Sequence, residues 1–312
     1  MPDKRRLAMR VVDLFAGCGG MSLGLEQAGL NVVGAFDNWD PAITIYKDNF
    51  QHPIFKEDLS SEDADARVAQ LKPDLIAGGP PCQDYSIAGY RNLGQRANLT
   101  IRFAQIVSAV KPKWVLFENV YNIEKFRTLP EMKKILCDAG YGLSSMVLDA
   151  SRCGAPQKRR RFILVGRLGT ADGFLDSFLK GGLSAKQMTV RDYLGDSLHT
   201  QFYYMHPRSF NRRAVFSIDE PSSTIRGTNR PISKNYKRHP ADKADISEGV
   251  RVLTSRERAL LQTFPPDFRL SGAKTDVEQA IGNAVPPALA RYVANCINQW
   301  IAANPEKQEK TS

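Results

Sequence analysis

Short apolar runs alternate with helical periodicities along the first half of the chain. The apolar runs predict strands at 11–15, 32–36, 75–77, 114–117, 145–148 and 162–165. Between them, apolar positions that recur every three to four residues predict helices at 21–28, 41–49, 100–110 and 130–139. Gly29 and Gly140 stand where such helices end. This alternation predicts a doubly wound α/β core, a mostly parallel sheet with helices on both faces.

The pattern changes after Gly166, where turn-rich, aromatic and basic sequence continues to about Gly249. Residues 208–238 hold eight basic side chains against two acidic ones, more than half of the chain's excess positive charge. We interpret this region as a smaller, mostly β or irregular domain that faces nucleic acid. The alternative is an insertion whose charges only contact water.

The last helical pattern starts at Pro286 and Pro287 and carries apolar residues on one face as far as Ile301. We expect it to pack back on the first sheet, which has no covering helix before its first strand. The sequence therefore predicts an α/β domain of residues 8–166 with 270–303, a second domain of residues 167–269, and a frayed tail at 304–312.

The composition of the 312 residues is that of an ordinary soluble protein, with 42% hydrophobic and 24% charged residues. No apolar run approaches the ~20 residues of a membrane-spanning helix, and the N-terminus lacks the apolar centre of a signal peptide. The five cysteines form no C-x-x-C pair, which argues against a disulfide framework and a structural zinc site. A net charge of +10 favours a polyanionic partner.

Polar and glycine-rich segments follow the first three strands, where a nucleoside ligand would lie. The first is Asp13-Leu-Phe-Ala-Gly-Cys-Gly-Gly20, in which close glycines allow a ligand to approach the backbone. The second is Asp37-Asn38-Trp39, which supplies a polar group for ribose hydroxyls and an indole for adenine. Asp58 follows a presumed third strand. The glycine segment alone fits a dinucleotide, S-adenosylmethionine or a tight turn.

A cysteine and a carboxyl group follow the next two strands. Cys82 ends the segment Gly78-Gly-Pro-Pro-Cys82, and Glu118 lies at the end of the strand in Phe117-Glu-Asn-Val120. In doubly wound folds ligands bind at the carboxyl edge of the sheet, so both groups are expected in one pocket. A thiol held there by a rigid Pro-Pro turn is placed as a nucleophile.

The ordered series DLFAGCGG, GGPPCQDYS, FENV, QKRRRFILVG and IGNAVPP resembles the bacterial DNA cytosine carbon-5 methyltransferases, from about Asp13 to Ile297. The resemblance implies a Rossmann-like S-adenosylmethionine-dependent methyltransferase sheet with a smaller target recognition domain. It further implies methylation of carbon 5 of cytosine within a short double-stranded DNA sequence, through a covalent cysteine adduct at carbon 6 of a flipped-out base.

By this resemblance Cys82 is the nucleophile, Glu118 is the acid at ring nitrogen 3, and Arg159 and Arg161 line the base pocket. The cofactor contacts implied for S-adenosylmethionine are Phe15, Gly17, Gly19, Gly20, Asp37, Asn38, Trp39, Asp58, Leu59, Gly78, Pro80, Leu99, Asn283 and Ala284. The DNA contacts implied are Ser86, Arg96, Thr224, Ile225, Arg226, Asn229 and Arg230.

The sequence departs from the family where an acidic residue normally precedes the aromatic after the second strand. Asn38 stands there and Asp37 comes before it, so either residue is a candidate for the ribose. Asp84 also replaces a small or neutral residue, and Arg96-Ala-Asn-Leu99 replaces the commoner Arg-Gly-x-Leu. None of these changes affects the bond-making groups.

Other functions fit less of the sequence. Amino-group methylation usually shows Asp, Asn or Ser before Pro-Pro, and a zinc deaminase requires H-x-E with P-C-x-x-C. A nicotinamide dehydrogenase leaves Cys82, Glu118 and the basic region unused. Two alternatives remain: a tRNA cytosine carbon-5 methyltransferase of the same fold, and a non-catalytic DNA-binding homologue.

The expected setting is the cytoplasm of a bacterium, at the nucleoid through DNA. We expect a monomer without metal or membrane attachment. Its partners would be double-stranded DNA and, in a restriction–modification pair, an endonuclease acting on the same site.

Overall fold

The computed structural model describes residues 8–81, 98–209 and 211–305, and its core is a seven-stranded sheet. The strands, in chain order, are β1 Arg10–Leu14, β2 Asn31–Asp37, β3 Ile54–Lys56, β4 Leu75–Gly78, β5 Trp114–Val120, β6 Tyr141–Asp149 and β7 Arg160–Leu168. Their order in the sheet is β3-β2-β1-β4-β5-β7-β6. β7 pairs antiparallel with both β5 and β6, whereas the other pairs are parallel. The predicted α/β class is confirmed.

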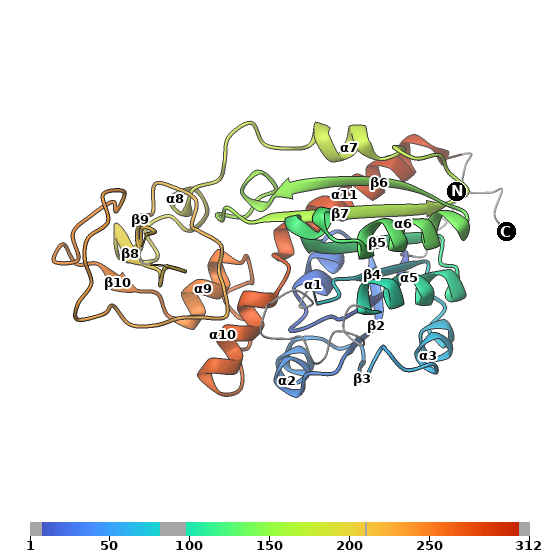
Figure 1. Ribbon diagram of the computed structural model, residues 1–312, viewed down its shortest axis with the longest axis horizontal. Helices are drawn as coiled ribbons and strands as arrows, with labels where there is room; N and C mark the ends of the chain where they lie inside the picture. Colours follow the sequence, from blue (N-terminus) through green and yellow to red (C-terminus); the bar gives the residue numbers. More distant parts are fainter. Residues whose placement is uncertain (1–7, 82–97, 210, 306–312) are drawn as a thin grey trace, which may run out of the picture.

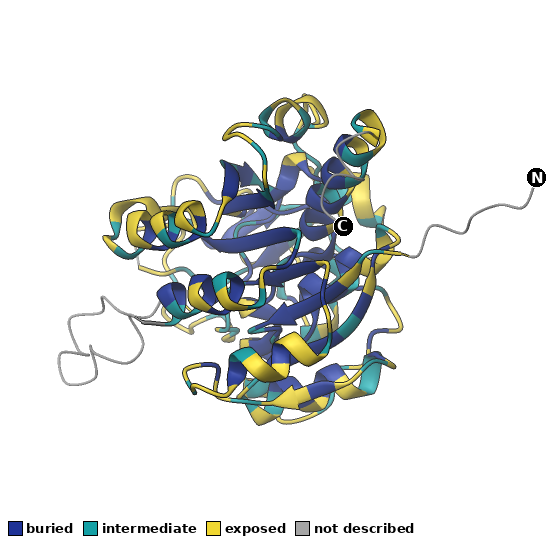
Figure 2. Cartoon of the chain, turned by 90° about the vertical axis from the view of Figure 1, so that its right-hand side faces the viewer, coloured by how far each residue is buried: buried dark blue, intermediate teal, exposed yellow. Residues whose placement is uncertain are grey.

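Helices cover both faces of this sheet, and the sheet between them is buried (Figures 1 and 2). One face packs against α1 Gly20–Gln27, α7 Asp176–Gly181 and α11 Pro287–Ala303. The other packs against α3 Ala64–Gln70, α5 Asn98–Val110 and α6 Thr128–Asp138. No helix in the described part of the chain is long and apolar enough to cross a membrane.

The C-terminal helix α11 lies directly against α1, at the other end of the sequence. At Gly24 of α1 a Cβ atom would lie 2.3 Å from the carbonyl oxygen of Pro287 and 2.6 Å from the Cβ of Ala290. Only a residue without a side chain therefore allows the two helices to approach this closely. α11 thus packs against α1 on one face of the first sheet.

A smaller unit lies at the end of the molecule away from the two termini (Figure 1). Its three-stranded sheet has the order β10-β8-β9, formed by β8 Phe202–Tyr204, β9 Val215–Ser217 and β10 Arg251–Val252. The short helix α8 Val190–Leu194 precedes it. Helices α9 Ser255–Leu261 and α10 Lys274–Asn283 connect it to α11.

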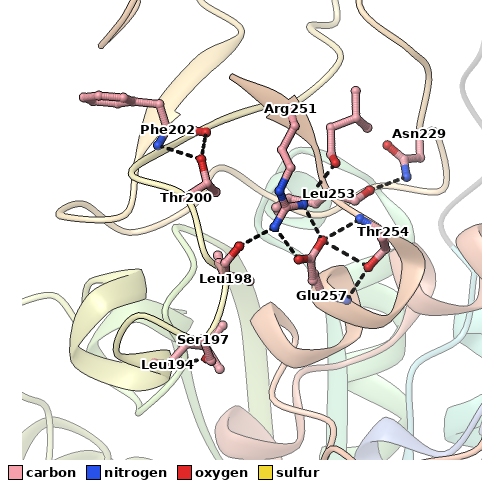
Figure 3. A network of polar contacts seen from close by, with 11 residues as sticks. Leu194, Ser197, Leu198, Thr200, Phe202, Asn229, Arg251, Leu253, Thr254 and Glu257 are labelled. Carbon is pink, nitrogen blue, oxygen red and sulfur yellow. Dashed lines mark hydrogen bonds and ion pairs between the residues drawn. The ribbon is translucent and has the colours of Figure 1, made fainter. Parts of the chain in front are cut away.

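The start of α9 is fixed by a local polar network (Figure 3). Thr254 accepts from the N–H of Glu257 and the Glu257 carboxylate accepts from the N–H of Thr254, which is a capping box. The same carboxylate pairs with Arg251 of β10, at 2.8 Å from Nη1. This links the small sheet to the helix that carries the chain back to the first domain.

The six strands predicted from apolar runs are all present. β1 is shifted by one residue and the other five are longer than predicted. The short edge strand β3 corresponds to the third strand presumed before Asp58, whose bounds were not predicted. The helices α3, α7, α8 and α10 were not predicted. α3 buries only Ala64 and Val68, so its sequence carries little apolar periodicity.

Candidate active site

The carboxyl ends of β4 and β5 bring a glycine–proline segment beside a buried glutamate. A Cβ atom at Gly79 would lie 3.0 Å from Oε2 of Glu118, so these two residues are adjacent. Asn119 of β5 donates from Nδ2 to the carbonyl oxygen of Pro80 at 3.0 Å. The chain is thereby fixed next to Glu118 just before the predicted nucleophile. Cys82 itself, with Ser86 and Arg96, lies outside the described residues.

Glu118 is 7% exposed and forms an ion pair with Arg161 of β7, whose Nε lies 2.9 Å from Oε1. Burial raises the pKa of Glu118, and the neighbouring Arg161 and Arg159 oppose this shift. Burial likewise lowers the pKa of Arg161, with the carboxylate opposing. A buried carboxyl group of raised pKa beside two cations can both donate and accept a proton, as a general acid requires.

Arg159 is fully buried and joins three parts of the chain. Its guanidinium donates to the carbonyl oxygens of Ile225 at 2.8 Å, Gly282 at 3.0 Å and Ala284 at 2.9 Å. Its Nε has no hydrogen-bond partner among the described residues. Burial and the positive charge of Arg161 lower the pKa of Arg159. The residue lines the cleft described below, and it also holds the second domain and the α10–α11 junction onto β7.

The glycine segment after β1 is built on left-handed backbone. Phe15, Gly17 and Gly19 have φ values of 59°, 55° and 92°. A Cβ at Gly19 would lie 2.3 Å from the ring of Phe50, whereas at Gly17 it would meet nothing within 4 Å. Gly19 is therefore required for packing, and Gly17 faces open space where a ligand has room.

The carboxylate of Asp37 fixes this segment. It accepts from the N–H of Gly17 at 2.8 Å and from the N–H of Trp39 at 2.9 Å. Asn38, between Asp37 and Trp39 in the sequence, is exposed, and Trp39 is half-buried. Both oxygens of Asp37 are thus engaged by backbone, which leaves the Asn38 side chain as the more accessible of the two ribose candidates.

The remaining cofactor candidates surround the same edge of the sheet. Asp58 accepts from Ser60 through Oδ1, and Leu59 beside it is buried. Leu99 lies half-buried on α5. The backbone of a neighbouring segment lies close to two of the candidate glycines. A Cβ added at Gly20 would lie 2.2 Å from the carbonyl oxygen of Val285, and a Cβ added at Gly78 would lie 2.7 Å from the carbonyl oxygen of Leu14. Ala284 follows α10, next to Asn283.

A chain of buried polar groups below the glycine segment was not predicted. Asp13 accepts from Oγ of Ser22 at 2.6 Å, Ser22 contacts the Tyr46 hydroxyl at 2.7 Å, and Tyr46 contacts Nε2 of His52 at 2.6 Å. His52 Nδ1 lies 3.1 Å from Glu26. Burial raises the pKa of Asp13 to about 7. A single aspartate in a strand gives no sequence signal for such a network.

A cleft of about 960 Å³ beside Arg161, the ion-pair partner of Glu118, is lined by residues of both domains. The first domain contributes Val120, Tyr121, Asn122, Lys158, Arg159, Arg161 and Asn283. The second domain contributes Met205, His206, Pro207, Arg208, Arg212, Arg213, Ser223, Thr224, Ile225 and Arg226. Arg159 and Arg161, expected in the base pocket, and Asn283, expected at the cofactor, therefore line one space together. His206, Arg208 and Arg212 were not singled out individually, although the charge of their region was.

The predicted DNA contacts have different positions around this cleft. Thr224 lies on its wall and donates through Oγ1 to the Lys158 carbonyl at 2.8 Å. The side chain of Ile225 is fully buried, and its N–H donates to Gln157 at 2.9 Å. Arg226 donates to the carbonyl of His206.

The other two candidates lie beside this segment. Asn229 donates through Nδ2 to Leu253 at 3.0 Å and to Glu278 at 2.8 Å (Figure 3 shows the first contact). Arg230 is exposed. The amide hydrogens of Asn229 are thus used inside the protein.

Two solved structures share this arrangement. The S. pombe Dnmt2 methyltransferase aligns with a TM-score of 0.70 at 20% identity, covering 95% of this chain and 99% of its own. The Entamoeba histolytica methyltransferase EhMeth aligns with a TM-score of 0.66 at 17% identity, covering 96% and 100%. The chain thus has the α/β fold of these methyltransferases.

Sequence comparison narrows this class. A family profile described as "C-5 cytosine-specific DNA methylase" matches residues 9–299. The type II methyltransferase M.HindV of Haemophilus influenzae is 54% identical over 292 residues, 93% of this chain and 96% of its own. M.HgiDI of Herpetosiphon aurantiacus is 50% identical over 297 residues, which are 94% of this chain and 95% of its own. The chain belongs to the C-5 cytosine-specific DNA methylase family, and it is a DNA cytosine-5-methyltransferase of the type II restriction–modification kind.

Proposed function

We propose that this enzyme methylates carbon 5 of one cytosine within a short double-stranded DNA sequence, with S-adenosylmethionine as methyl donor. Cys82 bonds transiently to carbon 6 of a cytosine that has been flipped out of the duplex. The observation that carries the proposal is the buried Glu118–Arg161 pair, 2.9 Å apart at the carboxyl edge of the sheet and next to the segment that leads to Cys82.

The residues around the glycine segment fit this cofactor. Gly17 leaves open space on its ligand-facing side, and the exposed Asn38 and half-buried Trp39 follow the adjacent strand. When bound there, S-adenosylmethionine supplies an electrophilic methyl group. Asn38 would hold the ribose and Trp39 the adenine, while Asp37 keeps the backbone of the segment in place. Asp58, Asn283 and Ala284 are further proposed contacts of S-adenosylmethionine.

The chemistry of cytosine explains the need for Cys82 and Glu118. Carbon 5 is a weak nucleophile until the Cys82 thiolate adds to carbon 6, which moves an electron pair towards nitrogen 3. Glu118 donates a proton or hydrogen bond to nitrogen 3 and stabilises the resulting enamine. After carbon 5 has gained the methyl group, a base or water takes its hydrogen as a proton. Elimination then breaks the bond between carbon 6 and sulfur, nitrogen 3 returns its proton to Glu118, and the thiolate and the aromatic ring are restored.

The two arginines support this chemistry by charge and position. Arg161 holds the Glu118 carboxyl in one orientation and, with Arg159, adds positive potential that lowers the pKa of a nearby thiol. We assign Arg161 to the wall of the base pocket. Arg159 acts there mainly by fixing the backbone of Ile225, Gly282 and Ala284.

A stacked base cannot reach such a pocket, so the target cytosine must leave the duplex at a cost of a few kcal/mol. The cleft between the two domains is where the duplex would lie, with Ser86, Arg96, Thr224, Arg226 and Arg230 as candidate contacts. We place the enzyme in the bacterial cytoplasm, acting as a monomer, with an endonuclease of the same specificity as its partner in a restriction–modification pair.

Two measurements test this proposal. Bisulfite sequencing of DNA from cells that express the protein should show methylation confined to one short sequence. Duplexes carrying 5-fluorocytosine at that position should form a covalent adduct that mass spectrometry maps to Cys82. We expect Cys82→Ser to lose both signals and Cys137→Ser, at an exposed cysteine, to keep them. Methylation that persists in Cys82→Ser would rule out the mechanism.

A further inference from the structure

The loop between β8 and β9 carries three arginines, Arg208, Arg212 and Arg213, which differ in their contacts with the rest of the protein. Met205 donates from its N–H to the Ala214 carbonyl at 2.8 Å, which closes the base of the loop. Asp242 accepts from the N–H groups of Ala214 at 2.8 Å and Val215 at 2.9 Å, so the strand that leaves the loop is also fixed. Described residues of the loop, Arg208 and Arg212 among them, line the cleft, and the strands on either side of them are fixed by these hydrogen bonds.

Arg213 on this loop is engaged within the protein. Its guanidinium donates to both oxygens of Glu220, at 2.9 Å and 2.7 Å, and lies over the ring of Phe216 at 4.3 Å from the centroid. A bidentate pair of this kind uses the planar donor set that would otherwise read a base. Arg213 thus reaches the cleft but has its donors occupied.

Arg208 and Arg212 are exposed and line the same cleft. Within the described part of the chain, no carboxylate pairs with either of them. Their positive charges lie close enough to Arg226 to lower its pKa, after the larger effect of burial. Like charges gathered without counter-charges repel one another, and such a group is stabilised when an anionic or acceptor-rich partner fills the space between them.

Arg226 and Asn229, which the sequence motifs favoured for base contacts, are held by hydrogen bonds within the protein, unlike Arg208 and Arg212. Arg226 donates to the His206 carbonyl, and its own carbonyl accepts from Arg258. Asn229 uses its amide hydrogens on Leu253 and Glu278. Among the described residues of this wall, Arg208 and Arg212 are therefore arginines whose guanidinium groups form no hydrogen bond or ion pair with the protein.

We propose that Arg208 and Arg212 determine sequence specificity by donating to guanine bases of the target in the major groove, while Arg213 does not. Guanine presents two acceptors, O6 and N7, which match the paired N–H groups of a guanidinium. The proposal rests on the proposed function for its DNA substrate. In the proposed function the reacting base lies at Glu118 and Arg161. Arg161 lines the same cleft as Arg208 and Arg212, so guanines within a few base pairs of the target cytosine are within reach of this loop.

The test uses binding, so that it does not depend on methylation. A random duplex library is selected for binding to the full-length protein, and each G·C pair of the selected sequence is then replaced by A·T. Affinities are measured for wild type, Arg208→Gln, Arg212→Gln and Arg213→Gln. Because discrimination is a ratio of two affinities from one preparation, partial misfolding of a variant does not change it.

We expect wild type and Arg213→Gln to discriminate roughly 10- to 100-fold at the contacted G·C pairs. Arg208→Gln and Arg212→Gln should each lose this discrimination at one pair and keep it at the others. Uniform weakening on all duplexes, with a smaller dependence on salt, would show phosphate contacts and overturn the proposal. Equal loss of discrimination in Arg213→Gln would also overturn it. If the selected duplex is bound but no cytosine in it is methylated, the proposed function fails separately.

Discussion

Glu118 and Arg161 form an ion pair across the antiparallel strands β5 and β7, with 2.9 Å between Oε1 and Nε. The pair places a buried acid and its cation where the sheet changes from parallel to antiparallel pairing. Because Arg159 comes directly before β7, the start of this strand carries both the charge that orients the acid and the contacts that hold the second domain.

Glu118→Gln should lower kcat by about 10²- to 10⁴-fold, since glutamine can donate a hydrogen bond but cannot transfer a proton. Burial raises the pKa of the carboxyl, so the protonated form persists to higher pH than in a free glutamate. The wild-type rate should therefore fall as pH rises through this raised pKa. That falling limb should be missing from the profile of Glu118→Gln, measured as methyl transfer to duplex DNA at saturating cofactor.

Glu124→Gln is the matched control, because Glu124 is exposed on the turn just after β5. It should keep the wild-type rate and pH profile. A Glu118→Gln enzyme with an unchanged rate would show that another group protonates the base.

Arg159→Ala should destabilise the protein by about 3 kcal/mol or more, because three backbone carbonyls would lose a charged donor in a buried position. Arg152→Ala, at an exposed position on the same approach to β7, should change stability by less than about 0.5 kcal/mol. Urea denaturation followed by circular dichroism measures both. Equal stability of the two variants would mean that the carbonyls find other partners.

The sequence was sufficient for the sheet and its edge but not for the details of the site. Buried strands produce apolar runs, so β1, β2, β4 and β5 and the residues that follow them could be predicted. Whether Asp37 or Asn38 faces the ribose depends on backbone hydrogen bonds to Gly17 and Trp39, which no pattern encodes. The cleft-facing arginines differ from their engaged neighbours only through tertiary contacts, such as that between Arg213 and Glu220.

Asp13 should make stability depend on pH. Its pKa rises from an ordinary value of about 3.9 to about 7 because burial disfavours the charge, although Ser22 and His52 oppose this. The folded state therefore binds the proton more tightly than the unfolded state. The stabilisation that protonated Asp13 contributes to the folded state is fully present below about pH 4. It is lost between about pH 4 and pH 7, by about 1.4 kcal/mol for each pH unit.

The measurement compares wild type with Asp13→Asn, which cannot titrate but can still accept from Ser22. Between pH 5 and pH 7 the unfolding free energy of the wild type should fall by about 2 kcal/mol more than that of the variant. Parallel pH dependences in the two proteins would show that Asp13 is ionised throughout.

The contact of α1 with α11 gives a prediction about packing alone. Gly24→Ala would place a methyl group 2.3 Å from the Pro287 oxygen and 2.6 Å from the Ala290 Cβ, so the helices must separate. Overpacking of this size costs about 1–3 kcal/mol, which exceeds the gain of up to about 1 kcal/mol from replacing glycine in a helix. Gly181→Ala in α7, where a Cβ meets nothing within 4 Å, should be neutral or slightly stabilising. Thermal denaturation of the two variants separates overpacking from helix propensity, because both variants replace a helical glycine by alanine and only Gly24→Ala adds a steric clash. If Gly24→Ala is as stable as Gly181→Ala, α11 does not approach α1 as closely as described.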